Sequence, residues 1–242
     1  MAPGVLSIAF DLAQDLGVDL PAWGLAWART APTIILVPAF GLRAIPAPAR
    51  AMLGLVIAAA VAPAIAVTRD PSLPWALAAA YEGLRGVPVA IGAAAALWAA
   101  SQAGGLVDNL RGGREQASLP NVESGSTPTG AMLSMLIAVA FLEGGGASKV
   151  AQALIRADQD VEHAFSRAVV TLLASIEVSI AVAAPVIAAS IVLEVASALV
   201  SRAASPAYLQ PLLAPLKSLA ILGVFALILE RVVELLAIAS LS

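Results

Sequence analysis

Two long apolar blocks, residues 164–200 and 209–241, constrain the fold of this chain more than any other feature of its sequence. Each exceeds the roughly 20 apolar residues that an α-helix needs to cross the hydrocarbon core of a membrane. Shorter apolar stretches occupy residues 23–40, 47–67, 75–100 and 130–142. The ten-residue alternation of membrane β-barrels does not occur in the sequence, and its alanine-rich runs favour helix. The sequence therefore predicts an all-α, polytopic membrane protein.

Composition leads to the same class. Hydrophobic residues make up 60% of the 242 residues and charged residues only 12%, against about 45–50% and about 25% in soluble domains. The surplus apolar surface must therefore face lipid or other subunits. A net charge of −3 provides no basic surface for nucleic acid. Because the chain has no cysteine, disulfides, thiolate nucleophiles and cysteine metal sites are excluded.

The second half of the chain reads as a helical hairpin. The block at 164–200 is too long for one simple span and contains Pro185, which predicts two helices or one helix broken at the proline. The block at 209–241 is similar, with Pro211 and Pro215 near its start. The polar segment 201–206 between the blocks predicts a tight turn.

Several ionisable residues interrupt the apolar stretches: Arg29, Glu82, Arg85, Glu177, Glu194, Lys217, Glu230, Arg231 and Glu234. Such groups are costly at membrane depth, so they pair with one another or face a cavity. One interpretation is a proton or ion path. We favour pairing between helices, because the charges are mixed in sign, scattered and often close to helix ends. Glu82 and Arg85, spaced i, i+3, are expected to pair on one helix face.

Sequence motifs for catalysis are missing. The chain has no His-Glu-x-x-His, Walker or Gly-x-Ser-x-Gly pattern. Its single histidine, His163, lies in a polar stretch and is expected to be a solvated loop residue or a helix cap. The glycine runs at 104–105, 112–113 and 144–146 are expected to be helix breaks or close-packing points. We therefore expect neither an enzyme nor a cofactor.

Four segments resemble one family of export proteins. Residues 103–114, AGGLVDNLRGGR, are similar to the G-x-x-(I/L/V)-D-N-x-R-G stretch of the SctT family of type III secretion, whose flagellar relative is FliR. Residues 127–146 resemble the family's helix that ends in a Gly-Gly turn. Residues 27–50 and 184–218 also resemble family blocks, in the family's order. The resemblance covers residues 20–230, and its Asp-Asn-x-Arg-Gly form favours the injectisome branch.

The resemblance implies a non-enzymatic part of an export gate that lines a conduit for protein export across the bacterial inner membrane. It implies a single domain, 1–242, with an SctR-like part at 20–162 and an SctS-like hairpin at 163–242. The implied partners are SctR- and SctS-like subunits, SctU- and SctV-like proteins, inner rod or needle subunits, exported unfolded proteins and membrane lipid. In such an assembly, charged residues can be satisfied at subunit interfaces.

The candidate gate and assembly residues come from the resembling segments and from the charges within the apolar stretches; they are Asp108, Asn109, Arg111, Gly112, Glu177, Glu194, Arg202 and Lys217. We expect an Asp108–Arg111 contact to hold the turn at 108–112, with Gly112 and Gly113 adopting backbone angles that other residues resist. The turn is then either a gate or neighbour contact, or only a stable loop. Glu177, Glu194 and Lys217 are expected at helix or subunit contacts rather than facing lipid.

Two other classes of protein stay open. A small-solute transporter would place paired charges around broken helices, usually within inverted repeats, and such repeats are not evident in the sequence. An intramembrane enzyme would need a nucleophile with its base, or a metal cluster. The single histidine and the lack of cysteine argue against that class.

Overall fold

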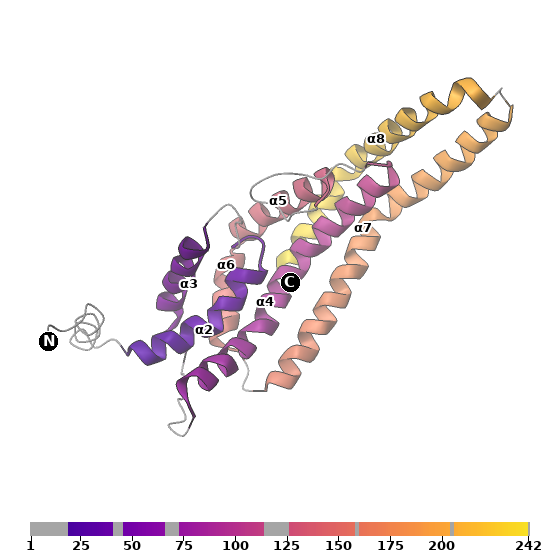
Figure 1. The fold of residues 1–242 in the computed structure, drawn as a ribbon. Helices are drawn as coiled ribbons and strands as arrows, with labels where there is room; N and C mark the ends of the chain where they lie inside the picture. The colour runs from indigo at the N-terminus through magenta and orange to yellow at the C-terminus, as the bar shows by residue number, and fades with distance from the viewer. Residues whose placement is uncertain are drawn as a thin grey trace. The chain divides into compact units, whose positions relative to one another are not determined.

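The computed structural model describes residues 19–40, 46–65, 73–113, 126–157, 160–203 and 206–241. Over these residues the chain forms seven α-helices and no strand (Figure 1). The helices are α2 (Leu20–Leu36), α3 (Ala47–Val61), α4 (Trp75–Leu110), α5 (Pro128–Glu143), α6 (Gly146–Ile155), α7 (Val161–Ala203) and α8 (Pro206–Leu241). The predicted all-α class is confirmed.

Three of the described helices are long and apolar enough to cross a membrane. They are α4, α7 and the segment Leu212–Ile238 of α8, and α5 with α6 adds a fourth if the two form one broken span. The break falls in the glycine run, where Gly145 has a φ of +77° that favours glycine. A Cβ on Gly146 would overlap the ring of Phe141. The multi-pass character and the glycine break are both confirmed.

The first two apolar stretches are shorter helices than we expected. α2 has 17 residues and α3 has 15, which at 1.5 Å per residue gives about 25 Å and about 22 Å. Both fall short of the roughly 30 Å hydrocarbon core. α2 ends at Leu36, and Val37, which precedes Pro38, is extended as that position favours. Neither helix is among the candidate membrane spans of the described residues.

The third apolar stretch forms a longer helix than its composition indicated. α4 continues ten residues beyond Ala100, where the apolar stretch ends, and it stops at Leu110. Glycines and polar residues are tolerated in this last part because α5 packs against it at Gly104. Asp108 and Asn109 therefore lie in the last turn of α4.

The hairpin consists of two long helices instead of four short ones. α7 runs unbroken for 43 residues with Pro185 inside it, and α8 runs for 36 residues. A proline removes only one backbone hydrogen bond, and the other bonds on both sides of it remain. The predicted breaks in both blocks were therefore wrong. The predicted hairpin is confirmed, since α7 ends at Ala203 and α8 starts at Pro206 (Figure 1).

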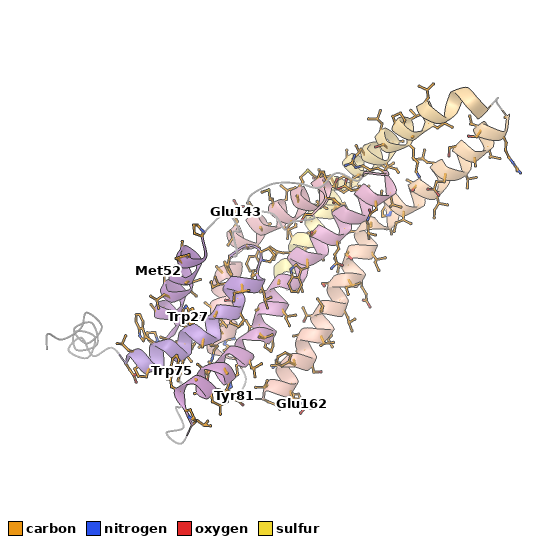
Figure 2. All side chains as sticks on the ribbon, viewed as in Figure 1. Trp27, Met52, Trp75, Tyr81, Glu143 and Glu162 are labelled. Atoms are coloured by element: carbon orange, nitrogen blue, oxygen red, sulfur yellow. The ribbon has the colours of Figure 1, made fainter. Side chains whose placement is uncertain are left out.

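The helices form two compact units. Unit 1 contains α2, α3, α4 up to Ala93, α6 from Ala147 and α7 up to Val169, and unit 2 contains the rest of α4 and α7 with α5 and α8. In unit 1, α2 packs on α3, and Trp27 lies against Gly54 (Figure 2). In unit 2, α5 packs on α8. The division expected from the resemblance, at residues 162 and 163, stays a prediction.

Candidate functional site

The carboxylate of Asp108 joins the end of α4 to the start of α5 in unit 2. Its Oδ1 accepts hydrogen bonds from Arg111 Nε at 2.7 Å and from Thr129 Oγ1 at 2.7 Å. Its Oδ2 accepts one from the backbone N–H of Thr129 at 2.8 Å. Asp108 is fully buried. We call Asp108, Arg111 and Thr129 the Asp108 clamp; it satisfies one of the free N–H groups in the first turn of α5.

Two glycines let the backbones of α4 and α5 meet beside the Asp108 clamp. A Cβ on Gly104 would lie 2.5 Å from the backbone N of Gly130, and a Cβ on Gly130 would lie 2.7 Å from the carbonyl oxygen of Ser101. Thr127 caps α5, because its hydroxyl accepts a hydrogen bond from the Gly130 N–H. Glycine is therefore required at both positions, because the backbones of α4 and α5 are too close to leave room for a side chain.

The turn after α4 agrees with the sequence prediction in part. The Asp108–Arg111 contact is present, and Gly112 has a φ of +78°. Gly113 was predicted wrongly: its φ is not positive, and its N–H donates to the Asp108 carbonyl oxygen at 2.9 Å. A side chain at Gly113 would instead meet the guanidinium of Arg111. The sequence analysis also missed Thr129, which contacts Asp108 from 21 residues away.

A second cluster of charges lies in the core of unit 1. Glu82 accepts hydrogen bonds from Arg29 Nε at 2.6 Å and from Arg85 Nη1 at 3.0 Å, and Arg29 Nη1 donates to the carbonyl oxygen of Leu154 at 3.3 Å. Arg29 and Glu82 are buried. This Arg29–Glu82–Arg85 cluster links α2, α4 and α6. The Glu82–Arg85 pair was predicted, whereas the Arg29 contact was not.

Two glycines on α4 let the backbone of α2 come close enough for the Arg29–Glu82–Arg85 cluster to form. A Cβ on Gly86 would overlap the carbonyl oxygen of Arg29, and a Cβ on Gly83 would lie 3.6 Å from that of Ala28. Arg85 also lies over the ring of Tyr81, at 4.6 Å from the ring centroid. Glycines next to a charged residue in an apolar helix were the sequence signal that could have predicted this contact.

The candidate charges of the hairpin do not converge on one site. Lys217 Nζ and Glu194 Oε1 lie 2.6 Å apart and join α7 to α8. Glu177 and Arg202 are exposed in the single chain. Neither forms a hydrogen bond or ion pair with any residue that the structure describes. The expected burial of Glu177 and Glu194 is therefore not provided by this chain itself and stays a prediction for the assembled state.

Two further contacts lie near the ends of the hairpin. Near the end of α8, Arg231 pairs with Glu234 at 3.3 Å, and both side chains are exposed in the single chain. At the start of α7, His163 is exposed, and its backbone N–H donates to Asp160 Oδ1 at 3.2 Å. That N–H, together with the His163 imidazole, lowers the pKa of the Asp160 carboxyl.

The polar contacts between the described helices are hydrogen bonds and ion pairs. No group of three or more His, Asp or Glu side chains in this part of the chain could hold a metal ion. The Asp108 clamp and the Arg29–Glu82–Arg85 cluster both hold helices in register. Both are contacts within the chain that fix the positions of its own helices.

A comparison with protein families identifies the family of this chain. The family described as bacterial export proteins, family 1, matches residues 20–240. The chain belongs to this family. The match confirms the resemblance to SctT and FliR over nearly the whole chain. A search among curated proteins found no match. As a bacterial export protein of family 1, the chain is a membrane-embedded component of protein export that acts with other components of an export apparatus.

Proposed function

We propose that this bacterial export protein is a non-enzymatic subunit of the type III secretion export gate. It lines one wall of the conduit through which unfolded proteins cross the bacterial inner membrane. The family match over residues 20–240 is the observation that carries the proposal. The sequence Asp108-Asn109-Leu110-Arg111-Gly112 supports the injectisome branch, because it resembles that branch's motif.

The surface of the hairpin supports a role within an assembly. Large apolar side chains of α7 and α8 are exposed in the single chain, and Leu227 reaches 87% exposure. Surfaces of this kind are covered by lipid or by other subunits. Mixed charges such as Glu177 and Arg202 accompany the apolar side chains, which favours protein neighbours, because lipid tails cannot satisfy charged groups. The proposed neighbours are SctR- and SctS-like subunits.

The Asp108 clamp contributes to this function by fixing the surface that α4 and α5 present to neighbouring subunits. Asp108 and Arg111 are inside the clamp, whereas Asn109 is exposed beside it and available to a neighbour. Gly112 ends α4 with a left-handed residue. Arg202 at the hairpin turn is a further candidate for a neighbour contact.

The remaining parts of the proposal concern energy and outer partners. The sequence contains no nucleotide-binding loop, so export energy has to be supplied by other components. SctU- and SctV-like proteins are the proposed neighbours on the export side, and inner rod or needle subunits continue the conduit. In this proposal the chain forms part of the conduit wall and contacts neighbouring subunits, and it does not catalyse a reaction.

Affinity purification in mild detergent tests the proposal. A tagged chain should be recovered with SctR- and SctS-like subunits from cells that secrete through a type III system, and deletion of its gene should abolish that secretion while general secretion continues. Recovery of the chain alone as a monodisperse protein, with type III secretion intact in the deletion strain, would overturn the assignment.

A further inference from the structure

Glu177 lies on the outer face of α7 among apolar side chains. The inner face is marked by the buried residues Ser175, Ser179, Ala183 and Val186. Glu177 is two positions from both serines, which places it on the opposite side of a helix with 3.6 residues per turn. We call this opposite side, with Leu173, Glu177 and Ile180, the Glu177 face; its apolar members are 52–56% exposed.

The Glu177 face is far from other charges on α7. The nearest charged residues along the helix are Arg167, ten positions before, and Glu194, seventeen positions after. At 1.5 Å per residue these lie about 15 Å and about 25 Å away along the axis. Whatever covers Leu173 and Ile180 must therefore also cover the Glu177 carboxylate.

Three other carboxylates in the apolar helices have a cation from the same chain, whereas the exposed Glu230 of α8 pairs with no described residue. Glu82 has Arg85 at 3.0 Å, Asp108 has Arg111 at 2.7 Å and Glu194 has Lys217 at 2.6 Å. Glu177 forms no hydrogen bond or ion pair with any described residue. A carboxylate removed from water without a partner is strongly disfavoured. Since no described residue pairs with Glu177, a Glu177 carboxylate that is covered by apolar groups needs a cation from outside this part of the chain.

We propose that the Glu177 face docks an apolar helix of a neighbouring export subunit, and that this helix carries a lysine or arginine that pairs with Glu177. The inference rests on the proposed function, because it names the chemistry of one gate neighbour. Apolar side chains around the pair exclude water, which strengthens the attraction between the charges. The pair then selects the partner and fixes its depth against α7.

Charge reversal in the intact complex tests the pairing. Glu177→Lys should lower the recovery of the neighbouring subunit with the tagged chain roughly tenfold or more, because like charges would meet in a desolvated contact. Glu177→Gln should lower this recovery less, by about threefold, because the amide oxygen of glutamine still accepts a hydrogen bond. Glu162→Lys makes the same charge change in the exposed first turn of α7 and should leave recovery unchanged.

Photo-crosslinking identifies the partner and allows a rescue. A crosslinking amino acid at Ile180 should join the chain to a helix containing Lys or Arg, while the same group at the buried Ala183 should not. Replacing that basic residue by Glu should restore assembly with Glu177→Lys, which also shows that the variant folds. Crosslinks to lipid only, a partner segment without a basic residue, failed rescue, or normal assembly of Glu177→Lys would each overturn the inference. If the wild-type chain recovers no export subunit, the proposed function fails instead.

Discussion

Arg29 and Glu82 form a buried ion pair between α2 and α4, although 53 residues separate them in the sequence. Glu82 has one negative charge and contacts two guanidinium groups, those of Arg29 and Arg85. The Arg29–Glu82–Arg85 cluster therefore has one surplus positive charge in a mostly apolar environment. This imbalance makes the three members unequal in their contribution to stability.

Removing the Glu82 carboxylate should destabilise the protein more than removing the Arg29 guanidinium. Glu82→Leu leaves two guanidiniums without their counter-ion and should destabilise the protein by about 3–5 kcal/mol. Arg29→Leu leaves the neutral pair of Glu82 and Arg85 and should cost about 1–3 kcal/mol. Thermal unfolding of both variants in the purified complex gives the order. A larger loss for Arg29→Leu would contradict the surplus charge.

The contact between α2 and α4 depends on glycine at position 86. Gly86→Ala places a methyl group on the Arg29 carbonyl oxygen, and the resulting separation of the helices should cost about 1–3 kcal/mol. Gly92→Ala is a matched control in the same helix, since a Cβ there meets nothing within 4 Å. The control should be neutral or stabilising by about 0.5–1 kcal/mol. Equal melting temperatures for the two variants would argue against the close contact.

The Asp108 clamp should be structural first. Asp108→Ala leaves the Thr129 N–H and hydroxyl without their acceptor and removes one contact of the Arg111 guanidinium, and each Thr129 group left unpaired costs about 1–3 kcal/mol. Secretion should fall because gate assembly weakens. Arg111→Ala should have a smaller effect in the same direction, and Gln102→Ala, exposed in the same helix, should have none. An Asp108→Ala chain that assembles and secretes normally would refute the role of the clamp.

The Glu194–Lys217 pair should behave as a modest link within the hairpin. The Glu194 side chain is 63% exposed in the single chain, and exposed pairs contribute about 0–1 kcal/mol. Glu194→Lys should reduce the level of the chain slightly, and Lys217→Glu added to it should restore that level. A double-mutant cycle on complex stability measures the coupling. Additive losses without any restoration would show that the contact is not used.

Local sequence signals predicted much of this fold. The apolar blocks gave the helices, the polar segment at 201–206 gave the hairpin turn and the glycines at 144–146 gave a break. The i, i+3 spacing gave the Glu82–Arg85 and Asp108–Arg111 pairs. Each of these features depends on residues within one or two helix turns, so tertiary packing is not needed to recognise them.

Contacts between distant segments could not be predicted in the same way. Arg29 with Glu82, and Thr129 with Asp108, depend on which helix faces meet. The unbroken course of α7 across Pro185 was also missed, since a lone proline gives the same signal in a kinked and in a continuous helix. The partner of Glu177 is likewise not encoded near it in the sequence.

The half-life of the chain in cells tests its central dependence on an assembly. Exposed apolar faces on α7 and α8, with unpaired charges such as Glu177 among them, need neighbouring subunits to cover them. Pulse-chase labelling should therefore show rapid loss of the chain expressed alone, and a several-fold longer half-life when SctR- and SctS-like subunits are expressed with it. A long-lived, monodisperse chain in the absence of every partner would contradict the account and favour a protein that works alone, such as a transporter.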